Sequence, residues 1–258
     1  MTKSVEKESQ KGRIIGRVLP GAVRLWLQTQ VEQVDLLTVD LLGRDRQLIS
    51  GYISGVTLSA EKVVYKGLAL SQVQLAAEDI RINLGQVIRG KPLRLMKRFP
   101  VKGQVLLSNA DVMASMASPL LVKGLTDFWR SLVQLPDFAR AVEERYGVRS
   151  LQPDVQLHRP LIKLGAGYLV LSFYPQNRGQ VDEQPIILGT ELVVVSDHFL
   201  ALTSPCWSDD VAIADISQGK PIKALSDFRL DLGSDTQITQ LDLQPTQLVC
   251  TGQIMVNP

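Results

Sequence analysis

The apolar positions near the start of the chain recur at helical spacing. From Val23 to Val34 they return every three or four residues, and Pro20 falls in the first turn, where its missing N–H costs least. This pattern predicts a helix from residue 18 to about residue 35. An amphipathic helix with Arg24 beside its apolar stripe can lie on a membrane or dock on the protein's own sheet, and we favour docking.

Two long regions alternate apolar and polar residues in steps of two, which is typical of strands with one buried face. The first begins near residue 36, and we expect three or four strands within residues 48–85, with a hairpin turn at residues 65–68. The second covers residues 155–258 and ends in a pair of strands joined by a short polar turn. Sheets this long, with few helices to cover them, require a curved form. The predicted fold class is α+β, with long curved antiparallel sheets, elongated and barrel-like, packed on the N-terminal helix and a central broken helix.

The central stretch between these regions carries the signals of an interrupted helix. Ser108 and Asp111 form a capping-box pattern, in which the serine hydroxyl accepts the N–H three residues further on. Ser118 and Pro119 have the form of a new N-cap and first helical residue, so we expect the helix to bend or restart there. A third helical segment follows and is predicted to end at Gly147.

The net charge of +2 hides an uneven distribution of charged residues. Residues 1–103 carry 17 Lys and Arg against 9 Asp and Glu, residues 104–179 carry 8 against 6, and residues 180–258 carry 3 against 11. A chain with such segregated charge presents a dipolar surface if its ends lie apart, and this bears on the choice of partner.

One segment of the basic part concentrates positive charge without an acidic residue. Gly90 and Pro92 mark it as a loop, and as a structural feature it is simply solvated. As a functional feature it attracts anionic surfaces, by ~1 kcal/mol for each Lys or Arg beside an acidic leaflet. No aromatic-interleaved motif or recognition helix accompanies it, so we expect lipid headgroups as partners and no nucleic acid. The predicted headgroup or membrane-surface residues are Arg89, Lys91, Arg94, Lys97, Arg98 and Lys102.

Residues with catalytic or metal-binding chemistry are few and scattered. His158 and His198 have no Cys or acid at metal-ligand spacing, and Cys206 and Cys250 form no C-x-x-C pair. No G-x-S-x-G, H-E-x-x-H or phosphate-loop motif occurs. We therefore expect a protein that is not an enzyme, binds no metal and needs no cofactor, and whose two thiols are free and mostly buried.

Several stretches resemble a bacterial family formerly catalogued only as a domain of unknown function. LLSNADVMASMASPLL, LPGAVRLWLQTQVEQVDLLTVDLLG and GYISGVTLSAEKVVYKGLALSQVQLAAEDIRI are similar to the LmeA-like phospholipid-binding family, and ITQLDLQPTQLVCTGQIMV is similar to its C-terminal hairpin. The layout fits from about residue 18 to residue 257, and the cyanobacterial branch is the most similar. The resemblance implies a phospholipid-binding protein, distantly similar to the tubular lipid-binding proteins that include bactericidal/permeability-increasing protein. Those proteins hold acyl chains in an apolar groove.

A lipid groove needs an apolar wall that adapts to flexible chains, and Met, Ala and Ser suit such a wall better than interlocking Ile and Phe. We therefore place the groove between the curved sheets and the central helices. Ala and Ser also permit close packing of a helix on a sheet, and we weight the two interpretations of residues 106–121 equally. The predicted groove residues are Val112, Met113, Met116, Leu120, Leu121, Leu125, Phe128, Trp129 and Leu132.

The predicted function is phospholipid binding, with lipid transfer or membrane-lipid homeostasis at an anionic membrane surface as its role. The alternative is a non-enzymatic scaffold with a filled core that assembles with itself or with a protein partner of unknown identity. A third interpretation, an enzyme acting on lipid headgroups, lacks a nucleophile and a base.

Residues 1–17 are expected to form a disordered basic tail, and residues 18–258 a single LmeA-like domain. The start of the chain does not have the pattern of a signal peptide. No stretch reaches the ~18 uninterrupted apolar residues of a membrane span. We therefore expect a cytoplasmic protein that is peripheral at a membrane.

Overall fold

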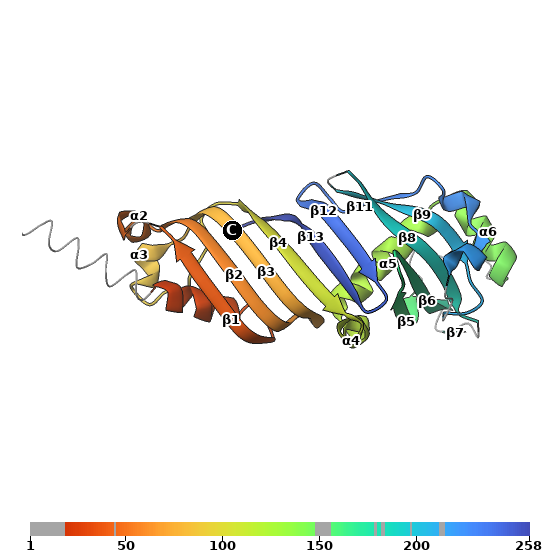
Figure 1. Cartoon of the computed structure of the whole chain (residues 1–258), viewed down its shortest axis with the longest axis horizontal. Helices are drawn as coiled ribbons and strands as arrows, with labels where there is room; N and C mark the ends of the chain where they lie inside the picture. Colours follow the sequence, from red (N-terminus) through yellow and green to blue (C-terminus); the bar gives the residue numbers. More distant parts are fainter. Residues whose placement is uncertain are drawn as a thin grey trace, which may run out of the picture. The chain divides into compact units, whose positions relative to one another are not determined.

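The computed structural model describes residues 19–43, 45–147, 156–177, 180–181, 184–196, 198–211 and 215–258 (Figure 1). Contacts separate the chain into two compact units. The first comprises Met1–Tyr65, Leu70–Val105 and Thr251–Pro258, and the second comprises Lys66–Ala69 and Leu106–Cys250. Compactness is not the same as independent folding, so the single domain predicted for residues 18–258 stays a prediction. The tail predicted for residues 1–17 lies outside the described residues.

The elements follow the predicted order of helix, strands, helices and strands. The strands are β1 (Gln33–Leu42), β2 (Tyr52–Tyr65), β3 (Leu68–Arg81), β4 (Phe99–Ser108), β5 (Gln156–Leu164), β6 (Tyr168–Asn177), β7 (Gln180–Val181), β8 (Ile186–Ser196), β9 (Phe199–Trp207), β10 (Lys220–Pro221), β11 (Arg229–Asp231), β12 (Thr236–Gln244) and β13 (Gln247–Val256). The helices are α2 (Asp45–Ile49), α3 (Leu84–Val87), α4 (Asn109–Ala114), α5 (Pro119–Val133) and α6 (Pro136–Tyr146), with 3-10 turns η1 (Ser115–Ala117), η2 (Ile216–Gln218) and η3 (Lys223–Leu225). The α+β class with two antiparallel sheets is confirmed.

One sheet has six strands in the order β1-β2-β3-β4-β13-β12. The turn between β2 and β3 is the predicted hairpin: Lys66 and Gly67 have φ of 49° and 74°, the left-handed pair that a type I′ turn requires. The expectation of three or four strands within residues 48–85 is wrong. That stretch holds two strands of 14 residues each, which run without a break on either side of this one hairpin turn.

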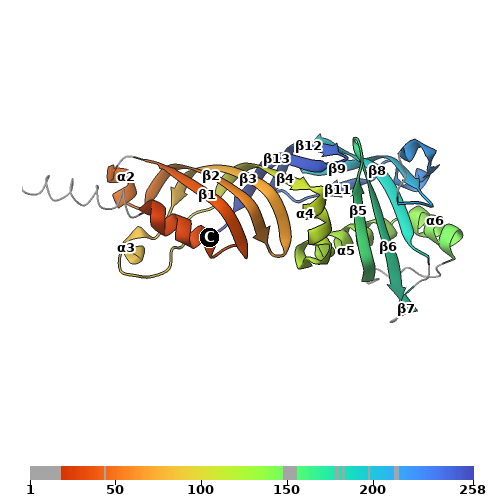
Figure 2. The same ribbon diagram turned by 60° about the horizontal axis from the view of Figure 1, so that its bottom comes forward.

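Local irregularities bend the strands of the first unit. Leu36, Lys62 and Asp79 have positive φ values of 47°, 48° and 55°, and the pairing of β1 with β2 shifts register between Asp35 and Thr38. Such bulges bend a strand and increase its right-handed twist. Figure 2 shows β1, β2 and β3 curving along their length, as predicted for sheets of this length.

A helix at residues 19–28 packs on the apolar face of these strands. Leu19 and Val23 are buried in one cluster with side chains of β2, β3 and β4, which agrees with the predicted docking. Its predicted end near residue 35 is wrong. The helix ends where Thr29 donates its hydroxyl to the carbonyl oxygen of Trp26 over 2.6 Å, and the chain then enters β1, which pairs with β2.

The second unit contains a sheet in the order β10-β9-β8-β6-β5, with β7 paired to β6 and β11 paired to β9. Its core is filled by aromatic and aliphatic side chains from α5, α6 and this sheet. The ring of Trp129 lies edge-on to Phe138 and Phe173, with centroid distances of 5.6 and 4.7 Å. Edge-to-face contacts at these distances are favourable for aromatic pairs and fix a rigid core.

The predicted helix boundaries of the central stretch are confirmed. Asp111 N–H donates to the Ser108 hydroxyl over 3.2 Å, and Ser108 N–H donates to the Asp111 carboxylate over 2.7 Å, which completes the capping box. Ser118 caps α5, accepting the N–H of Leu121 over 3.1 Å. Gly147 ends α6 with a φ of 67°. These signals are local, so they could be identified without knowledge of the tertiary structure.

Candidate functional site

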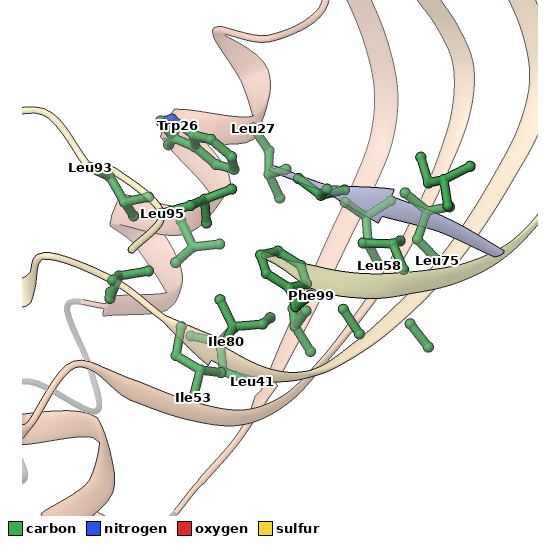
Figure 3. Close-up of a pocket in the computed structure, with 18 residues that line it drawn as sticks. Trp26, Leu27, Leu41, Ile53, Leu58, Leu75, Ile80, Leu93, Leu95 and Phe99 are labelled. Carbon is green, nitrogen blue, oxygen red and sulfur yellow. The ribbon is translucent and has the colours of Figure 1, made fainter. Parts of the chain in front are cut away.

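An apolar cavity of about 210 Å³ lies within the first unit (Figure 3). The helix at residues 19–28, strands β1 to β4, the segment at residues 93–95 and the end of β13 all contribute to its wall. Every lining side chain is apolar and none carries an ionisable group. The lining residues are Val23, Trp26, Leu27, Leu41, Ile53, Val56, Leu58, Leu75, Ala76, Ala77, Ile80, Ile82, Leu93, Leu95, Phe99, Val101, Ile254 and Val256.

At the end of β3, side chains point alternately into the cavity and to the exposed polar face. Ile80 and Ile82 line the cavity, while Asp79 and Arg81 alternate with them and are exposed. On the polar face the Tyr52 hydroxyl donates to the Asp79 carboxylate, and this hydrogen bond raises the pKa of the Tyr52 phenol above its ordinary value of 10.0. Ionisable groups are thus kept on the opposite face of the strand from the cavity.

The cavity is large enough for a flexible apolar ligand. A dry cavity of ~150 Å³ lined by aliphatic and aromatic side chains accommodates a benzene molecule. Its wall is not sealed: Trp26, Leu93 and Leu95 are only partly buried, and Ile254 is 51% exposed. Figure 3 shows Trp26, Leu93 and Leu95 gathered on one side of the cavity. The arrangement can take an acyl or alkyl chain and offers nothing to a polar one.

The predicted basic segment forms part of this wall. Leu95 pairs with Ile82 in an isolated β-bridge, so Leu93 and Leu95 reach the cavity while Arg94 between them is exposed. All six predicted headgroup residues are exposed. The segment also exposes Met96, at 61%. Positive charge and apolar surface therefore occur together at the edge of the cavity.

Asn83 fixes the position of the basic segment, and the sequence analysis did not single it out. Its side-chain oxygen accepts the N–H of Arg94 over 2.7 Å, and its side-chain nitrogen donates to the carbonyl oxygen of Pro92 over 3.0 Å. The backbone of Met96 donates to the carbonyl oxygen of Arg81 over 2.8 Å. These bonds hold the segment against the end of β3, and only the tertiary structure reveals them.

The nine predicted groove residues lie in the second unit, and none of them lines this cavity. Trp129 and Leu132 are fully buried in the filled core, and Val112 is buried beside Leu164. Met113 and Leu120 are exposed. The partly buried members of the set are Met116, Leu121, Leu125 and Phe128. Lipid binding by these residues stays a prediction, separate from the cavity of the first unit.

Two of the three serines in residues 106–121, Ser115 and Ser118, serve close packing. Ser115 is fully buried; its hydroxyl donates to the carbonyl oxygen of Asp111 over 2.7 Å and accepts the N–H of Ala69 over 2.8 Å. A Cβ added at Gly67 would lie 3.1 Å from the Cβ of Ser118. The hairpin turn therefore sits directly on the junction of η1 and α5, and larger side chains there would prevent this approach.

The described residues hold no group of three or more His, Cys, Asp or Glu side chains placed to bind a metal ion. Among the helices of the same residues, none is long and apolar enough to cross a membrane. Cys206 and Cys250 are free, with Cys206 buried and Cys250 partly buried, as expected.

Two antiparallel sheets and a wholly apolar cavity in the first unit characterise this α+β protein. The chain belongs to the LmeA-like phospholipid-binding family, whose sequence model matches residues 11–253. No match to the chain was found among curated proteins or among solved structures. Family membership supports lipid binding and a lipid partner; the cyanobacterial character of the chain stays a prediction.

Proposed function

We propose that the protein binds a phospholipid with part of an acyl chain in the cavity of the first unit and its headgroup beside the basic segment at residues 89–102. The lipid would be taken from or delivered to an anionic membrane surface, in transfer or in membrane-lipid homeostasis. One observation carries the proposal: Leu93 and Leu95 line the apolar cavity, and Arg94 lies exposed between them. An amphipathic ligand needs these two environments side by side.

The size of the cavity limits how much of a lipid it can hold. By the measure of ~150 Å³ for benzene, 210 Å³ accommodates about eight carbon atoms. At ~0.8 kcal/mol per buried CH₂, this contributes about 6 kcal/mol before the costs of association. The rest of the chain would lie along the partly exposed lining residues Leu58, Leu75 and Ile254.

The proposal is a binding function without catalysis. A wall made only of apolar side chains has no general acid, base or nucleophile to offer a bound chain. The proposed setting is the one expected from the sequence, a cytoplasmic protein that docks on a membrane. The filled-core scaffold is the competing outcome, and the experiments below separate it from lipid binding.

Native mass spectrometry of the full chain as purified tests the proposal directly. We expect masses that correspond to bound phospholipid, and phospholipid in the organic extract of the same sample. A protein that carries no lipid and takes none up from anionic liposomes would contradict the proposal and favour the scaffold.

Charge reversal tests the role of the basic segment. Lys91→Glu combined with Arg94→Glu should weaken binding to acidic vesicles by roughly thirtyfold or more, since each cation beside an acidic leaflet contributes ~1 kcal/mol. The matched control is Lys163→Glu with Arg229→Glu, which reverses two exposed cations of the second unit. Both double variants should keep their thermal stability. Equal losses in vesicle flotation would mean that net charge, and not this segment, governs docking.

A further inference from the structure

A hollow of about 750 Å³ lies in the second unit and shares no lining residue with the apolar cavity. One wall is α6, the other is β10 with η3, and the end of β9 forms the floor. Its volume falls in the range of small-molecule sites, ~300–1,000 Å³. The lining residues are Asp137, Arg140, Ala141, Glu144, Arg145, Trp207, Lys220, Pro221, Ile222, Lys223 and Ala224.

Positive charge is concentrated at this hollow against the trend of the surrounding sequence. Residues 180–258 contain only 3 Lys and Arg against 11 Asp and Glu, and two of those three, Lys220 and Lys223, line the hollow. Neither lysine forms an ion pair with any residue that the structure describes. Arg140 and Arg145 face them from α6, so cations approach from both walls.

Arg145 is held in place with part of its hydrogen-bonding capacity unused. Its side chain is only 22% exposed, and its Nε is buried without an acceptor in the described part of the chain. Its ion-pair partner is Asp209, at 2.5 Å, whose side chain is 97% exposed. An ion pair with so exposed a carboxylate is screened by water and contributes little. The weak pairing with Asp209 leaves the guanidinium able to bind an anion in the hollow that Arg145 lines.

The floor is rigid and partly apolar. Trp207 is buried and stacks on Phe138, with ring centroids 5.5 Å apart and planes inclined by 25°. Ile222 is buried beside it, while Ala141 and Ala224 leave room above. A ligand for this hollow therefore combines an anionic group with a small organic part. The lining holds two acids, Asp137 and Glu144, against the four cations, so the balance is positive even with Asp137 paired to Arg140 at 3.4 Å.

We propose that this hollow is a binding site for a small organic phosphate, a phosphate monoester held between the lysines of β10–η3 and the arginines of α6. A phosphate dianion can accept bonds from both walls at once, and Lys and Arg are the side chains that bind it best. The phosphate can belong to a free metabolite or to a phosphomonoester lipid headgroup. The site is independent of the acyl-chain cavity, and it goes beyond the proposed function.

Calorimetric titration of the full chain with glycerol 3-phosphate and with inorganic phosphate tests the site. We expect saturable binding that Lys220→Gln with Lys223→Gln weakens at least tenfold. Arg229→Gln, which removes the third cation of the same acidic region, should change the affinity less than twofold. Affinity should rise as the pH passes through ~6, where the monoester loses its second proton.

Two further arms identify the source of the phosphate and separate this proposal from the previous one. If only vesicles that contain phosphatidic acid bind through Lys220 and Lys223, the ligand is a lipid headgroup; binding of glycerol 3-phosphate itself indicates a free metabolite. A variant with a blocked apolar cavity should keep the phosphate site. The site would be overturned if glycerol 3-phosphate, inorganic phosphate and vesicles that contain phosphatidic acid all fail to bind saturably. Equal affinity in the lysine double variant, with its fold intact by circular dichroism, would overturn it as well.

Discussion

A larger side chain introduced into the apolar cavity of the first unit tests whether the cavity is empty space or a tightly packed core. Ala77 lies on β3, is buried and lines the cavity. A phenyl ring introduced by Ala77→Phe is the size of benzene, which ~150 Å³ accommodates, and the cavity offers about 210 Å³. Burial of the ring contributes about 1.5–3 kcal/mol, which offsets the cost of local adjustment. We expect the free energy of unfolding to stay within about 1 kcal/mol of the wild type or to rise.

The matched control is Ala60→Phe on the neighbouring strand β2. Ala60 is 3% exposed, but it is packed by Leu37, Val63 and Val73 and does not line the cavity. The same ring there must displace its neighbours, which typically destabilises a core by about 1–3 kcal/mol. The two variants introduce identical chemistry into one sheet and differ only in the space available.

Urea unfolding gives the two stabilities, and displacement of a fluorescent fatty acid gives lipid binding. All proteins are compared after delipidation, because bound lipid adds RT ln(1 + [L]/Kd) to the apparent stability of the wild type. Ala77→Phe should abolish fatty-acid uptake with its fold retained. If Ala77→Phe loses as much stability as Ala60→Phe, the hollow is not there. If it still binds lipid, the site is elsewhere, and the predicted groove residues of the second unit become the next candidates.

Two predictions concern the environment of Cys206. A Cβ at Gly219 would lie 2.5 Å from its sulfur and 2.7 Å from a backbone carbonyl oxygen, so Gly219→Ala should lower the free energy of unfolding by ~1–3 kcal/mol. The control Gly124→Ala, in open space on α5, should raise it by up to ~1 kcal/mol. Urea unfolding that ranks the two variants the other way contradicts this packing. Burial raises the pKa of the Cys206 thiol, so its reaction with an aromatic disulfide reagent should be much slower in the folded than in the unfolded chain. The unfolded chain then loses this proton at lower pH, and the free energy of unfolding should fall as the pH rises above the ordinary value of 9.0, less steeply in Cys206→Ala.

Elements that depend on neighbouring residues could be predicted from the sequence. The capping box at Ser108, the new N-cap at Ser118 and the hairpin turn at Lys66 are each set by hydrogen bonds or φ values within a few residues. The end of the first helix could not. Val34 lies at helical spacing from Val31 although it belongs to β1, and the long-range pairing of β1 with β2 decides against the helix.

The basic segment could be identified because its six cations lie within residues 89–102 without an acid. Its position at the cavity could not be predicted. Asn83, which lies 9 and 11 residues before its two partners in the segment, supplies the hydrogen bonds that hold it there. The cavity itself combines side chains from the first helix, strands β1 to β4, the segment at residues 93–95 and the end of β13. Alternation predicts that their apolar faces meet, and it does not say whether the faces interlock or leave space between them.

One compositional feature distinguishes the two units, and it bears on why the apolar cavity lies in the first. Of the six Phe and three Trp of the chain, only Trp26 and Phe99 fall in the first unit, while the rest lie within residues 106–250. Large rings fill irregular space, and those of the second unit interlock around Trp129. The first unit covers its long bent strands mainly with aliphatic side chains. The proposed acyl-chain site therefore lies in the unit that is poor in Phe and Trp, and the groove predicted at the central helices stays a separate prediction.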